Sequence, residues 1–323
     1  MLNDAHCHFF STRFFAALGR GLTISGGRKT FSSADAAIFA ASAPSGPAAP
    51  HEMALGRLGW EAPGSVEALA DRWAIELDRA GVSRAVLIGS VPGDAESIVS
   101  AVRRHPARFV GFVMIDPTQP DAAVEAEGAI RDGVRGICLF PAMHRYPVYD
   151  ERAKRIFEVA AAHPGAALFV HCGVLSVGVR RKLGLPSPFD MRFSNPLDLH
   201  AVALQYPAVP VIVPHFGAGF FREALMLADL CPNVHFDTSS SNSWVKYQPG
   251  GLTLGGVFRQ ALSVAGPDRL LFGSDSSFFP RGWVGDVHAA QSAALDEIGA
   301  ADEVRQKVFG GNFERLFPQP TGS

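Results

Sequence analysis

The sequence predicts an α/β fold, a closed (β/α)8 TIM barrel built from 323 residues as one domain. Short apolar runs alternate with longer amphipathic segments through nearly the whole chain, as expected for parallel strands that are buried on both faces. Polar residues also end apolar runs near both termini of the chain, and only barrel closure brings the first and last strands together. A doubly wound open sheet is therefore the less favoured alternative.

The predicted elements account for the length of the chain, because such a barrel needs about 250 residues and tolerates insertions. Eight apolar runs are predicted as strands, at residues 2–8, 84–89, 109–115, 136–140, 167–171, 209–215, 234–237 and 270–275. The clearest helical segments between them cover residues 65–80, 122–132, 151–162 and 220–230.

A long insertion, residues 9–64, interrupts this alternation after the first strand. It is rich in Gly, Ala, Ser and Pro, above all at 40–50. Loops of this length are usually lids, binding loops or disordered segments. Because it follows a strand end, we expect a lid-like insertion over the active face, with a disordered excursion as the alternative. A shorter insertion at 172–195 follows the fifth strand, and no second domain is predicted.

Composition excludes several classes of partner. The formal net charge of −2 argues against nucleic acid, which requires a basic surface. No apolar stretch reaches the ~20 residues that span a membrane, and the N-terminus lacks a signal-peptide pattern, so a cytoplasmic protein is expected. The four cysteines form no CxxC pair, which favours reduced thiols over disulfides or a zinc knuckle.

The strongest chemical signal is the run Asp4-Ala5-His6-Cys7-His8. Because side chains alternate along a strand, Asp4, His6 and His8 are expected on one face, with Ala5 and Cys7 on the other. Two imidazoles spaced in this way can bind one metal ion. The alternative is a surface strand on which the pair has no role.

Three further predicted strands end at an ionisable residue, namely His171, His215 and Asp275. Barrel enzymes place their chemistry at the C-terminal ends of their strands. A lone core histidine is more often a hydrogen-bonded packing residue than a ligand. Four histidines and one aspartate at four strand ends of one barrel, however, predict a metal centre.

These motifs resemble the amidohydrolase superfamily, specifically the amidohydrolase-2 branch that also contains aminocarboxymuconate semialdehyde decarboxylase. The resemblance covers nearly the whole chain, through the segments 4–8, 171–173, 214–217, 272–275 and 311–317. It implies that His6, His8, His171 and Asp275 are metal ligands, and that His215 lies beside the metal and acts on the substrate or the water. Relatives are often dimers, so the resemblance also implies a homodimer.

Two positions depart from the pattern of the relatives. Cys138 stands where relatives often have a lysine that bridges two metals, and because a cysteine cannot form that carbamate bridge we expect one metal ion. A buried thiol in an apolar strand is ordinary packing, which is favoured over a ligand role for Cys138. Ser276 and Ser277 replace an aromatic residue and a proline, which alters the loop expected to contact the substrate.

The expected cofactor is one divalent metal, most simply Zn²⁺, with Mn²⁺ or Fe²⁺ as alternatives for the same donors. Such an ion lowers the pKa of its water to about 7. Asp275 is expected to bind the metal and accept the proton of the water, while His215 polarises a carbonyl or protonates a leaving group. The predicted function is hydrolysis of a small carbonyl-type substrate. The alternatives are non-oxidative decarboxylation of an aromatic or unsaturated acid, and a non-catalytic binding protein with a decayed site.

A decarboxylase must also anchor a carboxylate, for which arginine is well suited. The candidates are Arg57, Arg145, Arg192, Arg222 and Arg281, and two of them converging on the metal would favour decarboxylation. Four other residues are candidates for substrate contact from the loops, with packing as the alternative for each: Trp60, His144, Phe278 and Trp283.

Overall fold

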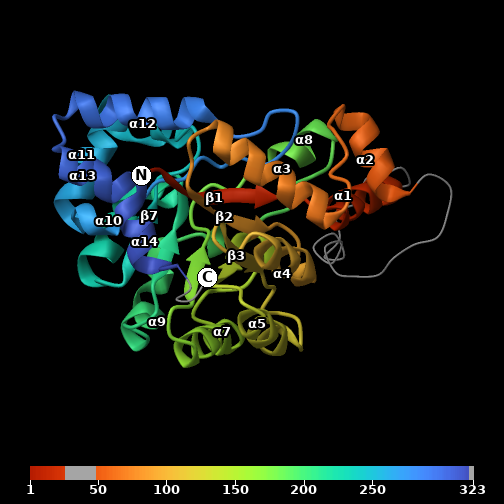
Figure 1. Cartoon of the computed structure of the whole chain (residues 1–323). Coiled ribbons are helices and arrows are strands. Elements are labelled where there is room, and N and C mark those ends of the chain that lie inside the picture. Colours follow the sequence, from red (N-terminus) through yellow and green to blue (C-terminus); the bar gives the residue numbers. More distant parts are fainter. Residues whose placement is uncertain (26–48, 320–323) are drawn as a thin grey trace.

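The structure, a computed structural model, describes residues 1–25 and 49–319. Its centre is a sheet of eight parallel strands in sequence order (Figure 1). The strands are β1 (Asn3–Phe9), β2 (Arg84–Gly89), β3 (Phe109–Met114), β4 (Gly136–Leu139), β5 (Ala167–Val170), β6 (Val211–Val213), β7 (Val234–Asp237) and β8 (Leu270–Leu271). The predicted ranges of β2 and β7 are confirmed to the residue.

The first and last strands meet through backbone hydrogen bonds. The amide of Ala5 donates to the carbonyl of Phe272 at 2.8 Å, and the amide of Asp275 donates to the carbonyl of His6 at 2.9 Å. A parallel bridge between Cys7 and Ser276 continues this contact. The barrel that the sequence predicted is therefore confirmed, and its closure joins residues almost 270 positions apart.

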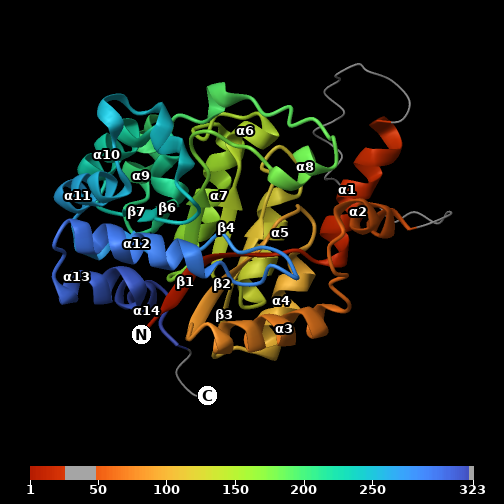
Figure 2. The ribbon, with the colours of Figure 1, turned by 90° about the horizontal axis from the view of Figure 1, so that it is seen from above.

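Helices surround the barrel (Figures 1 and 2), and the C-terminal α14 contacts β1. They are α1 (Thr12–Ser25), α2 (Pro50–Leu58), α3 (Val66–Arg79), α4 (Ala95–Arg104), α5 (Ala122–Arg131), α6 (Pro141–His144), α7 (Glu151–Ala162), α8 (Gly178–Lys182), α9 (His200–Gln205), α10 (Phe221–Leu230), α11 (Leu254–Ala265), α12 (Gly285–Glu297), α13 (Asp302–Gln306) and α14 (Asn312–Leu316). No helix in the described ranges combines the length and the apolar character needed to cross a membrane.

The apolar core has two layers, set by the alternation of side chains along each strand. On β2, Val86 and Ile88 belong to the cluster inside the barrel, together with Phe112 and Phe169. Leu87, between them, belongs to the layer between the strands and the helices. Each strand is therefore buried on both faces, which explains its continuous apolar sequence.

The insertion after β1 carries two helices that pack against each other at one side of the barrel (Figure 2). Phe14 and Leu18 of α1 are buried and belong to the cluster that fills the barrel interior. Of the stretch at 40–50, residues 40–48 lie outside the described residues. The described part of the insertion is thus ordered helical structure, while its role as a lid stays a prediction.

Candidate metal centre

The side chains of β1 do not alternate as strictly as the sequence predicted. The pairing of β1 with β2 shifts by one residue between Asp4 and Cys7, which is a β-bulge. As a result Ala5 belongs to the cluster inside the barrel, whereas Cys7 belongs to the outer layer. The prediction that Ala5 and Cys7 share a face is therefore wrong. The bulge leaves His6 and His8 both lining one cavity.

Three donors lie within reach of one metal ion: His6, His8 and Asp275, whose ligand atoms are all within 4.8 Å of one another. The Nε2 atoms of the two histidines are 3.3 Å apart. Oδ1 of Asp275 is 3.3 Å from Nε2 of His8 and 3.7 Å from Nε2 of His6. Two imidazoles and a carboxylate are a donor set that Zn²⁺, Mn²⁺ and Fe²⁺ all accept.

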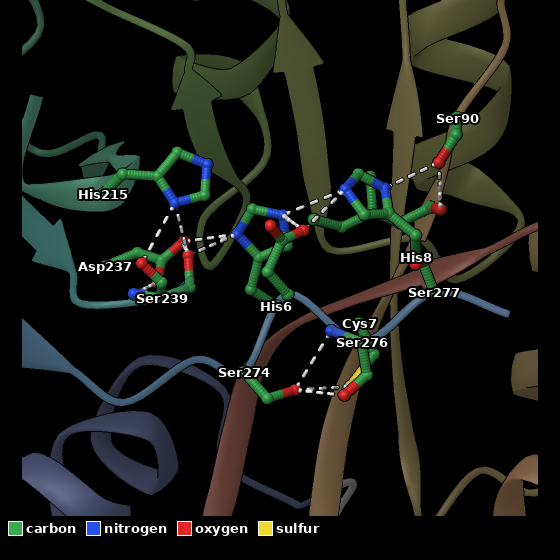
Figure 3. A network of polar contacts seen from close by, with 12 residues as sticks. His6, Cys7, His8, Ser90, His215, Asp237, Ser239, Ser274, Ser276 and Ser277 are labelled. Atoms are coloured by element: carbon green, nitrogen blue, oxygen red, sulfur yellow. Dashed lines mark hydrogen bonds and ion pairs between the residues drawn. The ribbon is translucent and has the colours of Figure 1, made fainter. Parts of the chain in front are cut away.

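The other ring nitrogen of each histidine is held by a partner behind it (Figure 3). Nδ1 of His6 lies 2.6 Å from the carboxylate of Asp237. Nδ1 of His8 lies 2.7 Å from Oγ of Ser90, whose hydroxyl donates to the carbonyl of Ile88 at 3.2 Å. When the Ser90 proton is used in that bond, Oγ of Ser90 accepts from Nδ1 of His8. With both Nδ1 atoms protonated, both Nε2 atoms have a lone pair for the same ion, as in metal-binding histidines.

The electrostatics of His8 and Asp275 agree with this arrangement. For His6, burial acts to lower the pKa, but the charge of Asp237 and the hydrogen bond to it outweigh burial and raise the pKa. Burial lowers the pKa of His8, which favours the neutral ring that a metal requires. For Asp275, burial acts to raise the pKa, but the close rings of His8 and His6 outweigh it and hold the pKa well below its usual value. The carboxylate is therefore ionised at neutral pH. The residues present fit a divalent ion.

His171 and His215 line the same cavity but lie outside the group of three donors. Their ring centroids are 5.5 Å apart, and the ring of His215 is 5.2 Å from that of His6. Nδ1 of His215 is 2.9 Å from Oγ of Ser239 and 3.2 Å from the carbonyl oxygen of Ser239. Nδ1 of His171 is buried and has no hydrogen-bond partner within the described chain. An unpaired buried nitrogen is costly, so a partner beyond residues 1–25 and 49–319 is expected there.

Backbone strain sets the direction of two of these side chains. His215 has φ of 54° and Asp275 has φ of 61°, in the left-handed region that such residues rarely adopt. The predicted strands were expected to run to these residues, but β6 ends at Val213 and β8 at Leu271. His215 therefore stands in a short turn after β6, whereas Asp275 lies beyond β8 in a segment that stays hydrogen-bonded to β1. The backbone at Gly173 packs closely against the turn that carries His215. A Cβ at position 173 would lie 2.1 Å from the carbonyl oxygen of Gly217, so only glycine is accommodated there.

A cavity of about 680 Å³ opens beside the donors. Of the candidate substrate residues, Trp60, Phe278 and Arg281 line it. The other candidates do not line it. Arg145 donates to the carbonyl of Pro188, while Arg222 and Arg192 form ion pairs with Glu223 and Asp190. Trp283 donates to Asp4, His144 is buried outside the lining, and Arg57 is exposed on α2. The structure thus brings one of the five candidate arginines to the donors.

Asp237, Ser90 and Ser239 are site residues that the sequence analysis did not single out. Asp237 ends β7 and Ser90 directly follows β2, so the rule that pointed to His171 and Asp275 applies to them as well. Ser239 carried no signal of its own, because its role depends on the neighbouring Asp237, His6 and His215. Cys138 packs inside the barrel, where burial raises the pKa of its thiol well above the usual value.

Replacing His171 with alanine is expected to give a protein that no longer retains its metal, because the free Nδ1 of a buried ring is available as the fourth donor. Metal content per chain, measured by elemental analysis after dialysis, checks this. Normal metal content with lost turnover would instead assign His171 to the substrate.

Comparisons with known proteins are consistent with the site. The sequence model of the amidohydrolase family matches residues 4–319. Among curated proteins, fluG of Emericella nidulans is 32% identical over 87 residues, which are 27% of this chain and span only a tenth (10%) of that protein.

Three solved structures share the fold. A 5-carboxyvanillate decarboxylase of Novosphingobium aromaticivorans with bound manganese has a TM-score of 0.62 at 18% identity, covering 98% of this chain and 97% of the other. A zinc-bound amidohydrolase of Burkholderia multivorans has a TM-score of 0.57 at 16% identity, covering 99% and 100%. A probable 2-pyrone-4,6-dicarboxylic acid hydrolase of Acinetobacter baumannii has a TM-score of 0.58 at 14% identity, covering 98% of each chain.

The family model spans nearly the entire chain. Within the matched residues, His6, His8 and Asp275 stand at strand ends of a closed barrel. This protein belongs to the amidohydrolase family.

Proposed function

We propose that this protein is a metal-dependent hydrolase that cleaves a small carbonyl-type substrate with an activated water. The observation that carries the proposal is the convergence of His6, His8 and Asp275 on one point at the base of a cavity of about 680 Å³. A cavity of this size suits a small organic molecule. We also propose that the ion is single, and that it is zinc, with His171 as the fourth protein donor.

A divalent ion held by these residues would supply a water of lowered pKa, typically about 7. Asp275 is ionised and faces the same point, so its carboxylate accepts the proton of the attacking water. The backbone carbonyl of Ser239 accepts from Nδ1 of His215, which leaves Nε2 of that ring for the substrate. Burial lowers the pKa of His215, so the ring is neutral at pH 7. His215 then takes up at Nε2 the proton that Asp275 accepted and delivers it to the leaving atom as the bond between that atom and the carbonyl carbon breaks.

Decarboxylation of an aromatic or unsaturated acid is the second candidate, and the position of Arg281 favours it. The guanidinium of Arg281 donates to the carbonyl oxygen of Asp275 at 3.3 Å, close enough to the donors to anchor a carboxylate. Only one of the five arginines considered from the sequence lines the cavity, however, and two were required to favour decarboxylation. Hydrolysis therefore remains the primary proposal.

The experiment that tests the proposal begins with purified protein of measured metal content. Lactones, amides and aromatic carboxylic acids are then screened in parallel, with product analysis and CO₂ detection. Hydrolysis of a lactone or amide that stops on chelation and returns with Zn²⁺ is the expected result. Release of CO₂ from an acid would overturn hydrolysis in favour of decarboxylation. Protein that binds neither zinc nor manganese would instead identify a non-catalytic binding protein.

A further inference from the structure

The cavity beside the donors is lined by four cations, Arg181, Lys182, Lys246 and Arg281. Elsewhere in the chain arginines commonly pair with a carboxylate, as in the 2.6 Å contact of Arg104 with Asp71. None of the four lining cations has such an ion pair within residues 1–25 and 49–319. Asp275 is the one carboxylate in the described lining, and it belongs to the donor group. The described lining therefore carries an excess of positive charge, which favours an anionic ligand.

One wall of this cavity is a row of flat side chains that begins at the donors. The ring of His8 is 5.5 Å from that of Phe10, and Phe10 is 6.5 Å from Trp60, with an angle of 10° between the planes. Trp60 in turn stacks on Phe278, with centroids 3.6 Å apart and planes 6° apart. Phe10 also stacks on Phe14 at 3.8 Å, so one face of Phe10, Trp60 and Phe278 is already covered. Because these residues line the cavity, a flat conjugated group can pack against the faces and edges that remain.

Two of the cations lie against the Trp60–Phe278 pair of this row, and one of them, Arg281, also reaches the backbone carbonyl of Asp275 at 3.3 Å. Nζ of Lys182 lies 5.4 Å from the centroid of Trp60 and 5.6 Å from that of Phe278. The guanidinium carbon of Arg281 lies 4.6 Å from the centroid of Phe278. Arg281 is also tied to Oγ of Ser277 at 2.8 Å, which limits the freedom of its side chain. Three separate segments thus converge here: the insertion with Trp60, α8 with Lys182, and the loop after β8 with Phe278 and Arg281.

We propose that Trp60, Phe278, Lys182 and Arg281 form a carboxylate subsite that binds the charged end of a flat, conjugated substrate. The substrate then lies along the aromatic row, with its carboxylate at Lys182 and its reacting carbonyl at His8 and Asp275. The location of the reacting carbonyl rests on the proposed function, whereas the charge preference does not. Because Trp60 belongs to the insertion, this assigns the described part of that insertion to substrate selection.

Binding of 2-naphthoate and of its neutral counterpart 2-naphthamide tests the subsite. Isothermal titration is carried out on metal-loaded protein and on chelator-treated protein, so that direct binding of the carboxylate to the metal is separated from the subsite. We expect the acid to bind about tenfold more tightly than the amide in both forms, as a hydrogen bond to a charged group provides. Lys182→Met and Arg281→Gln are each expected to remove most of this preference while leaving the affinity for the amide unchanged.

Lys246→Met is the matched control. It removes the same charge from the same cavity, but Nζ of Lys246 lies 5.1 Å from the ring of Tyr247 and not beside the Trp60–Phe278 pair. Its effect on the acid is expected to be about twofold, through the general potential alone. Equal affinity for acid and amide, or equal losses for Lys246→Met and Lys182→Met, would overturn the subsite. Hydrolysis of neutral amides without any preference for acids would overturn the subsite but leave the proposed function intact. Thermal unfolding checks that each variant is folded.

Discussion

Replacing His8 with alanine is expected to leave the protein without bound metal and without measurable turnover. The change removes one of three donors that lie within 4.8 Å of one another. It disturbs little else, because the hydroxyl of Ser90 behind the ring keeps its bond to the carbonyl of Ile88. Elemental analysis and a turnover assay on the same sample measure both effects.

Ser90→Ala is the control for this variant. It keeps the imidazole of His8 but removes the partner of Nδ1 at 2.7 Å. Loss of such a partner typically weakens metal binding about 10–100-fold, so metal is expected to return at higher concentration, together with activity. His8→Ala protein that keeps a full equivalent of metal would show that the donors are other residues.

Replacing His215 with alanine is expected to leave metal content unchanged and to lower turnover by about 10²–10³-fold, the usual effect of losing a group that stabilises the transition state. The ring of His215 lies 5.2 Å from that of His6 and outside the group of three donors. Its Nδ1 is held by Ser239 rather than by a metal-binding residue. The metal-to-protein ratio and kcat, measured with the hydrolysed substrate, check this prediction.

Addition of free imidazole provides a second measurement for this variant. If His215 transfers a proton, imidazole that enters the vacated space is expected to restore part of the rate. No such recovery is expected for His8→Ala, in which the metal itself is lost. His215→Ala protein that is purified without metal would make His215 a ligand and contradict the role assigned to it.

The barrel was predictable because its signal is repeated and local. Each strand is buried on both faces, so each appears in the sequence as a short apolar run, and the ranges of β2, β7 and α7 were predicted to the residue. Strands that end in strained turns were predicted less well. Nothing local to Val213 or Leu271 indicates that the regular strand ends two or more residues before His215 and Asp275.

For the insertion and the substrate residues too, the sequence could not predict contacts that depend on distant parts of the chain. Trp60 and Phe278 were predicted to face the substrate, and both line the cavity, stacked on each other. Arg145 and Arg222 were equally plausible from sequence, but each is held by a partner that sequence position alone does not indicate. Lys182 had no distinguishing pattern, because its place at the aromatic pair depends on how α8 packs over the cavity.

By itself, the sequence predicted the barrel from the period of its apolar residues and the family from the resemblance of its motifs, and both are confirmed. It also placed His6, His8 and Asp275 among the candidate metal ligands, and this assignment stays a prediction. Only the tertiary structure decided how the donors are oriented. The bulge in β1, the bond of His6 to Asp237 and that of His8 to Ser90 each join residues distant along the chain. The physical reason is that a metal-binding ring needs its second nitrogen fixed, and the atoms that fix it are brought close only when the barrel closes.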